Sequence, residues 1–141
     1  QMIAEMCLAL ALYHEARGEP HQGQLMVAAV VVNRVMSDRF PDEMCEVIMQ
    51  PRQFSFVRKG KIPKPKDDKA WQVSQRLASQ VLTDTRILPP TVADHYHTVK
   101  TNPAWRKDLN KILRVGSHIF YSYEKPRGVV VSLRPRLRPE K

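Results

Sequence analysis

The interpretation of the chain starts from the segment Ala11-Leu-Tyr-His-Glu-Ala-Arg-Gly-Glu-Pro20, because it contains both the predicted end of a helix and an ionisable side chain, Glu15, at that end. Upstream of it, apolar residues recur at helical spacing and predict a helix over residues 3–17, with an inward stripe of Ile3, Met6, Cys7, Leu10 and Ala11. Gly18 can adopt the positive φ found just past a helix end, and Pro20 cannot continue the helix. Glu15 is therefore expected in the last turn, where helical steps along the stripe bring it to the edge of the core.

A glutamate at this place suits acid catalysis. Burial raises the pKa of a carboxyl group, and a glutamic acid that stays protonated near neutral pH can protonate a glycosidic oxygen. A glutamate at a helix end is also commonly a solvated residue or an ion-pair partner, here of Arg17. The segment by itself leaves both interpretations open.

The composition fits one globular domain. The chain has 141 residues, of which 43% are hydrophobic and 26% charged, and its longest apolar run, residues 25–32, is far shorter than the roughly 20 residues of a membrane span. The chain starts at Gln1 without a basic and apolar leader, so we expect a removed signal, a trimmed chain or another export route. A net charge of +9 attracts polyanions or serves solubility.

Helices dominate the predicted secondary structure, which indicates a mainly α, α+β fold. The run 25–32 could be a buried strand, but the apolar pattern continues far enough to favour a central helix over 22–38, with Asn33 and Arg34 emerging at its far end. Further helices are expected at 43–49 after a capping Asp42, from an Asp67 or Asp68 cap to about Thr83, and from a turn at 102–106 through Leu113.

The remaining segments are predicted to be loops and short extended pieces. Extended structure is expected at 53–56, 95–99 and 118–123, with a mobile basic loop at 58–69. In the fourth predicted helix the apolar face comprises Trp71, Val73, Leu77, Ala78 and Val81. Residues 1–124 form the predicted domain, and 125–141 a basic, proline-containing tail with an edge strand at 129–131 and a disordered end.

The cysteines and histidines leave little room for a metal. Cys7 and Cys45 either form a disulfide between the first and third helices or remain buried thiols. His95 and His97 share one face of an extended segment but supply only two ligands, so hydrogen-bonding roles are favoured. We therefore expect no metal and no cofactor.

The ordered motifs of the chain resemble the SleB/CwlJ-type cell wall hydrolase family over roughly residues 5–123. They are Tyr13-His-Glu-Ala-Arg-Gly-Glu-Pro20, Gly23-Gln24, Val27-Ala-Ala-Val30, Asn33-Arg-Val35, Phe40-Pro41, Val47-Ile48, Gln53-Phe-Ser55, His95-Tyr-His97, Pro103-Ala-Trp105 and Gly116-Ser-His-Ile-Phe-Tyr121. The resemblance implies a lysozyme-like fold in which one helix presents a catalytic glutamate to a glycan.

Carried onto this sequence, the resemblance makes Glu15 the general acid. It implies that Gln53, Ser55, Tyr96 and His97 line the substrate site through hydrogen bonds, while Phe54 and Trp105 stack on sugar faces or fill the core. Glu19 matches the second glutamate of the motif; a structural ion pair with Arg17 or Arg34 is favoured over a role in catalysis. Asn33 is interpreted as structural and Tyr121 as a core residue.

The expected reaction is cleavage of peptidoglycan between N-acetylmuramic acid and N-acetylglucosamine. Glu15 has no evident carboxylate partner, which favours a lytic transglycosylase; the alternative is a muramidase in which Asp94 or Glu19 holds a water. A third hypothesis is a basic module that binds a polyanion. A nucleic-acid binder would have aromatic residues among its basic clusters, but here the aromatic residues lie in the family motifs, so no nucleic acid partner is expected. We expect a monomer that acts on peptidoglycan strands and the anionic envelope at the bacterial cell wall; a phage endolysin, made in the host cytoplasm, would share these features.

Overall fold

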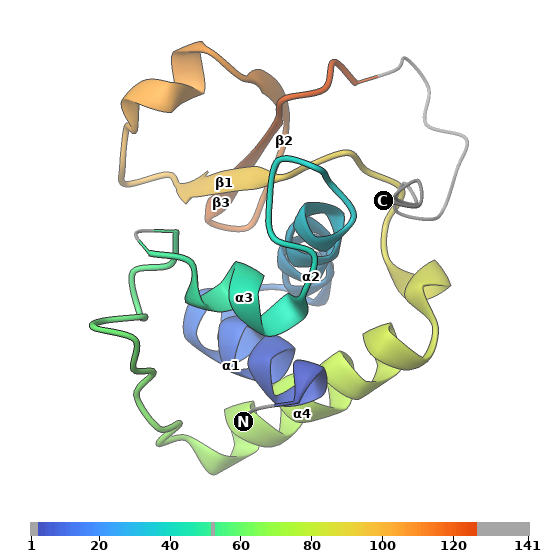
Figure 1. Cartoon of the computed structure of the whole chain (residues 1–141), viewed down its shortest axis with the longest axis vertical. Coiled ribbons are helices and arrows are strands. Elements are labelled where there is room, and N and C mark those ends of the chain that lie inside the picture. Colours follow the sequence, from blue (N-terminus) through green and yellow to red (C-terminus); the bar gives the residue numbers. More distant parts are fainter. Residues whose placement is uncertain (1–2, 52, 127–141) are drawn as a thin grey trace.

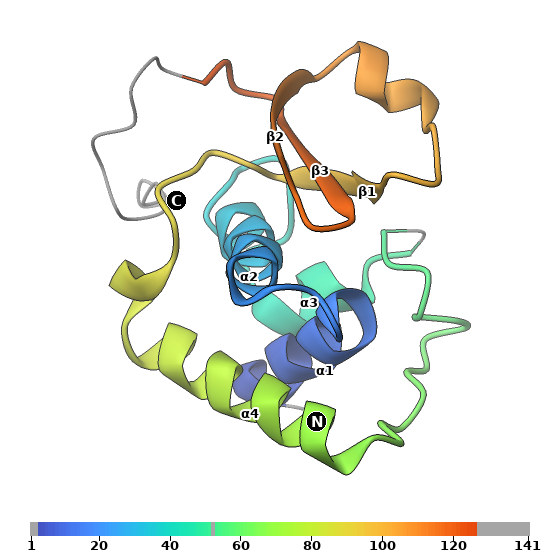
Figure 2. The same cartoon turned by 180° about the vertical axis from the view of Figure 1, so that it is seen from behind.

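The structure is a computed structural model that describes residues 3–51 and 53–126. Its elements, in chain order, are α1 (Ala4–Ala16), α2 (His21–Val35), α3 (Met44–Met49), α4 (Asp68–Thr83), the 3-10 helix η1 (Thr85–Ile87), β1 (His95–Thr98), the 3-10 helix η2 (Ala104–Lys107), β2 (Asn110–Val115) and β3 (His118–Ser122). Figures 1 and 2 show the small sheet at one end of the molecule and α4 at the opposite end. The mainly helical α+β prediction is confirmed, while the predicted tail from 127 onward lies outside the described residues.

Helix α1 is enclosed by the other helices after its first turn. It packs against α2, α3 and α4, and all residues from Cys7 to Tyr13 are buried. The predicted inward stripe is wrong at its start, because Ile3 and Met6 are 66% and 37% exposed. The helix ends as predicted: Glu15 lies in the last turn and Gly18 follows with φ +85°.

Helix α2 is the most deeply buried element, and every residue from Leu25 to Arg34 is shielded from solvent. The central-helix prediction is therefore confirmed, but Asn33 and Arg34 do not emerge at its end. The Asn33 amide donates to the backbone oxygens of Thr91 and Ala93, which holds the chain leading into β1. Asn33 is thus structural, as expected.

Helices α3 and α4 lie close to their predicted positions, with two corrections. Asp42 does not cap α3, because the helix begins one residue later and Glu43 takes the N-cap position without a side-chain cap. Asp67 does cap α4, since its side chain accepts from the amide of Ala70. Val73 is 47% exposed, so it does not belong to the inward face of α4.

The three strands form an antiparallel sheet in the order β1-β3-β2. The strands at 95–99 and 118–123 were predicted, but the helix through Leu113 was not found: η2 ends at Lys107 and a strand follows. The β-prone sequence of Leu113 to Val115 pairs with β3 across a tight turn at Gly116, whose φ is +58°. Pairing with a partner strand outweighs the helical turn signal at Pro103.

The segment 53–56 is not extended. Backbone hydrogen bonds from Gln53 to Gln50 and from Val57 to Phe54 fold it into successive turns. Within these turns Phe54 is buried, while Gln53 and Ser55 are exposed.

A disulfide joins Cys7 of α1 to Cys45 of α3, across 38 positions of the sequence. The sequence left open whether these cysteines form a disulfide or remain buried thiols, and the structure has the disulfide. The bond fastens the helix that carries Glu15 to its neighbour. In the described part of the chain, no helix combines the length and apolarity that a membrane crossing requires.

Candidate functional site

Glu15 and Tyr96 meet across the interface between α1 and β1. The Tyr96 hydroxyl donates a 2.5 Å hydrogen bond to Oε1 of Glu15, although 81 positions separate the two residues. Strand β1 alternates its side chains, so Tyr96 points toward the helices and packs against Phe120 and His118, with ring centroids 5.6 and 4.9 Å away. The structure thus brings together two residues that the family resemblance singled out.

The surroundings of this pair favour a protonated Glu15. Burial raises the pKa of Glu15, and this effect outweighs the Tyr96 hydrogen bond and the nearby Arg34 charge, which both lower it. Burial and the Glu15 carboxylate raise the pKa of Tyr96 well above its usual value, so the hydroxyl stays protonated and continues to donate. Oε1 of Glu15 therefore accepts the hydrogen bond from Tyr96, and Oε2 is the oxygen that can gain or lose a proton.

Arg34 is a component of the site that the sequence reasoning missed. It is 4% exposed, its Nε donates to the backbone oxygen of Asp94 at 2.8 Å, and its guanidinium lies 4.8 Å from the ring centre of Phe40 and 5.4 Å from that of Phe54. Its position was readable, because Arg34 follows the buried Val27, Val30 and Val31 by seven, four and three residues and so shares their face.

The motif around Gln53 divides between surface and core. Gln53 is exposed and its Oε1 accepts from Nη1 of Arg34 at 3.2 Å, which connects it to the buried arginine. Phe54 is 3% exposed and fills the core beneath Arg34, so it has no free face for a sugar. Ser55 is exposed beside it.

His97 and Trp105 lie on the other face of β1 from Tyr96. Nδ1 of His97 donates to the Thr98 carbonyl at 2.7 Å, and Nε2 lies 3.0 Å from the buried Tyr121 hydroxyl. The Trp105 ring packs against His95, His97 and Tyr121 at centroid distances of 5.1 to 5.6 Å. These contacts support the sheet from behind rather than joining Glu15, and Tyr121 is a core residue as expected.

The carboxylate of Asp94 accepts hydrogen bonds from nearby residues. Its carboxylate accepts from Nδ1 of His95 at 3.0 Å and from the amide of Tyr123 at 3.2 Å, which ties the start of β1 to the end of β3. Among the described residues, no group of three or more His, Cys, Asp or Glu side chains is arranged to hold a metal ion.

Glu19 fastens the sheet to the turn between α1 and α2, without the predicted arginine partners. Its two oxygens accept from the amide and hydroxyl of Ser117 at 2.9 and 2.6 Å, and Nδ1 of His118 lies 3.7 Å away. Burial favours a higher pKa for Glu19, but the Ser117 hydrogen bonds and His118 together lower it. Arg17 instead lies over the Tyr13 ring at 4.5 Å.

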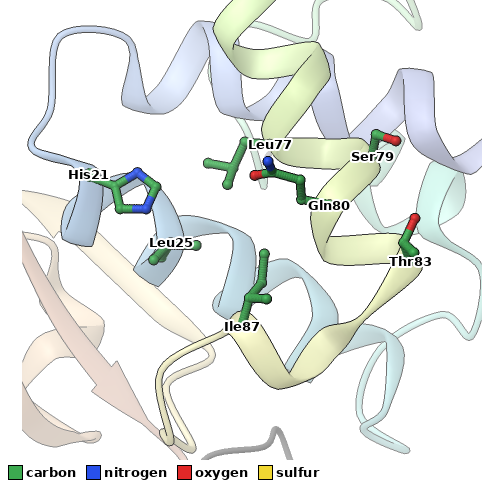
Figure 3. Close-up of a pocket in the computed structure, with 7 residues that line it drawn as sticks. All are labelled: His21, Leu25, Leu77, Ser79, Gln80, Thr83 and Ile87. Carbon is green, nitrogen blue, oxygen red and sulfur yellow. The ribbon is translucent and has the colours of Figure 1, made fainter.

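A surface hollow of about 530 Å³ lies between α2 and α4, lined by His21, Leu25, Leu77, Ser79, Gln80, Thr83 and Ile87 (Figure 3). Its lining contains no carboxylate, and Glu15 is not part of it. The hollow is therefore separate from the Glu15–Tyr96–Arg34 cluster.

Comparison with known proteins identifies the family of the chain. A family model described as Cell Wall Hydrolase matches residues 18–121, beginning just after the helix that carries Glu15. The chain is 51% identical over 115 residues to the spore cortex-lytic enzyme of Oceanobacillus iheyensis, and 38% identical over 114 residues to that of Halalkalibacterium halodurans. These alignments cover 80% of this chain but 39% and 33% of the two relatives, so the chain spans well under half the length of either.

Two solved structures share the fold. The catalytic domain of the germination-specific lytic transglycosylase SleB from Bacillus anthracis superimposes with a TM-score of 0.67 and 33% identity, covering 84% of this chain and 93% of that one. The catalytic domain of Bacillus cereus SleB gives a TM-score of 0.65 at 32% identity and 84% and 89% coverage. With the family model matching most of its length, this chain belongs to the cell wall hydrolase family.

Proposed function

We propose that the chain is a lytic transglycosylase that cleaves peptidoglycan between N-acetylmuramic acid and N-acetylglucosamine, with Glu15 as its one catalytic carboxyl group. The observation that carries the proposal is the state of Glu15: a carboxyl of raised pKa with one oxygen held by Tyr96. The name of the similar enzyme from Bacillus anthracis describes this reaction class.

In the first step, Glu15 transfers its proton from Oε2 to the glycosidic oxygen. The bond between C1 of the muramic acid and that oxygen breaks, and the N-acetylglucosamine side leaves with the proton as a hydroxyl. The Tyr96 hydrogen bond and the Arg34 charge both stabilise the carboxylate that forms, which allows a buried glutamic acid to release its proton.

In the second step, the Glu15 carboxylate takes the proton from the 6-hydroxyl of the same muramic acid. The 6-oxygen attacks C1 and closes a 1,6-anhydro ring, and Glu15 is protonated again for the next turnover. Because the attacking oxygen belongs to the substrate, the step gains from proximity and needs neither a bound water nor a second carboxylate.

The alternative muramidase needs such a second group, about 5 Å or about 6.5–9.5 Å from the acid. Glu19 and Asp94, the two candidates, use their oxygens to hold the turn between β2 and β3 and the start of β1. In the described part of the chain, the charge that acts on Glu15 is the cation Arg34. This arrangement favours the transglycosylase.

We propose that exposed residues near the Glu15 cluster position the sugar. Gln53, held by Arg34, and its neighbour Ser55 suit hydrogen bonds to hydroxyl and acetamido groups. His97 and Trp105 hold β1 from its far face and so position Tyr96. Phe54 supports Arg34 from below.

Mass spectrometry of digested peptidoglycan tests the reaction type. The proposal predicts soluble muropeptides that end in 1,6-anhydromuramic acid and are lighter by one water than hydrolytic products. Reducing muramic acid ends without anhydro ends would establish the muramidase instead. Absence of any soluble product would favour a binding module.

We further propose that the net charge of +9 concentrates the protein on the anionic bacterial cell wall. Raising the salt concentration should then weaken binding to whole sacculi more than it slows cleavage of a short neutral glycan. A parallel decline of both would contradict this role of the charge.

A further inference from the structure

Residues 58–66, here called the basic loop, concentrate positive charge next to the catalytic helix. The loop carries Arg58, Lys59, Lys61, Lys64 and Lys66 and no acidic residue. All five side chains are exposed, and among the described residues none of them forms an ion pair with a carboxylate. These cations are therefore available to a partner.

The backbone of the basic loop has a defined shape at its start. The amides of Arg58 and Lys61 each donate to the carbonyl of the other, at 3.0 and 2.9 Å. The turn between them passes through Lys59 and Gly60 with φ of 52° and 73°, a left-handed conformation that is uncommon for a lysine. Three cations are thus gathered around one tight turn.

Side chains of α1 fasten the loop one and two residues from Glu15. Nε2 of His14 donates to the Pro63 carbonyl at 2.9 Å, and the Tyr13 hydroxyl accepts from the amides of Lys66 and Asp67 at 3.1 and 3.0 Å. The His14 ring also stacks on Phe56, just before the loop, with centroids 4.9 Å apart. The loop is therefore fixed relative to the catalytic residue.

The anchoring of the loop indicates that its charge does more than keep the protein soluble. Like charges repel when they are held together, and a charge that serves solubility works as well when dispersed over the surface. Here Tyr13 and His14, the two side chains just before Glu15 on α1, hold the backbone of the loop at Lys66 and Pro63, and the Arg17 guanidinium lies over the Tyr13 ring at the end of the same helix. Such a placement suits an anion that accompanies the reacting sugar.

We propose that the basic loop binds the free carboxylates of the stem peptide carried by the muramic acid undergoing cleavage, an inference that rests on the proposed function. The stem peptide is attached to the reacting sugar through its lactyl group, so its carboxylates stay within reach of a loop fastened to the catalytic helix. Wall polyphosphates are linked elsewhere on the strand and lack this fixed relation. Lysine ammonium groups suit such flexible, single carboxylates, whereas phosphate recognition commonly uses bidentate arginine.

Binding measurements in the Glu15→Gln background test the proposal without depending on the reaction. The ligands are soluble glycan strands with uncrosslinked stem peptides, the same strands after an amidase has removed the peptides and left the lactyl carboxylate, and peptide-free strands carrying wall polyphosphate. We compare the parent with a loop variant, Lys61→Gln/Lys64→Gln/Lys66→Gln, which keeps the backbone contacts. A control variant, Arg76→Gln/Lys111→Gln/Lys125→Gln, removes the same charge from exposed positions of α4, β2 and the segment after β3.

The parent should bind peptide-bearing strands about three- to tenfold more tightly than peptide-free strands, as expected for a few exposed ion pairs. The loop variant should lose this ratio, and the control variant should keep it. Equal loss in both variants, an unchanged ratio in the loop variant, or an equal gain from wall polyphosphate on peptide-free strands would overturn the inference. Failure of the proposed function is a separate result, namely the absence of anhydromuramic ends from the Glu15-containing enzyme.

Discussion

Replacing Tyr96 by Phe removes the hydroxyl that donates to Glu15 and leaves the ring that packs against Phe120 and His118. The variant therefore tests the hydrogen bond rather than the packing. The Tyr96 bond lowers the pKa of Glu15, while burial raises it. Without the bond, the pKa of Glu15 should rise further.

The size of the effect follows from the energy of a hydrogen bond to a charged group, about 1.5–3 kcal/mol, which corresponds to about 1–2 pKa units. Arg34 remains and Glu15 keeps partial access to solvent, so we expect a shift near the lower end. The transition state contains a partly formed carboxylate and loses part of the same stabilisation, which should lower kcat/KM by about tenfold.

The assay is the pH profile of kcat/KM, measured as release of anhydromuramic ends. Activity requires protonated Glu15, so the alkaline limb of the profile should move upward by about one pH unit. Tyr121→Phe is the matched control, because it removes a buried hydroxyl that contacts His97 instead of Glu15. An alkaline limb that stays in place, moves downward, or moves equally in the control would refute the assigned role of Tyr96.

Glu15→Gln should fold normally and lose most peptidoglycan cleavage; near wild-type clearing of purified peptidoglycan would contradict its assignment. The pKa of Glu15 is raised in the folded state above its usual 4.5. The wild type therefore loses stability when Glu15 ionises, as the pH rises through the folded pKa. Because glutamine does not ionise, Glu15→Gln should have a higher Tm than the wild type above about pH 5 but not at pH 4. Reducing the disulfide between α1 and α3 releases a cross-link over 38 positions and should lower the free energy of unfolding by about 4 kcal/mol, measured by urea denaturation with and without reductant. Gly116→Ala should destabilise more than Gly18→Ala in thermal melts, because both positions have positive φ but the new Cβ at Gly116 would lie 2.4 Å from Oε1 of Glu19 while that at Gly18 meets nothing within 4 Å. Equal melting temperatures for the two variants would argue against that contact.

The sequence predicted the helical framework because its signals are local. The signals are the apolar spacing before Glu15, the glycine after it, the long apolar run of α2 and the Asp67 cap, and each acts within a few residues. The structure confirms the helices that they predict, although Ile3 and Met6 at the start of the apolar stripe are exposed. The expected place of Glu15 at the core boundary followed from the same periodicity. Local signals failed where a partner strand determines the secondary structure. The residues of β2 pair with β3 instead of continuing the predicted helix.

The partners of each ionisable group were beyond the reach of sequence spacing. Tyr96 meets Glu15 across 81 positions, and Glu19 meets Ser117 across 98 rather than the arginines close to it in sequence. Arg34 was expected to emerge at the far end of its helix, but it is buried, with its guanidinium against the rings of Phe40 and Phe54. By itself the sequence determined which helix carries Glu15 and where that helix ends, since helix formation depends on neighbours within a turn. The tertiary structure decided which carboxyl groups are free for chemistry, because that depends on the hydrogen bonds and desolvation imposed by segments far away along the chain.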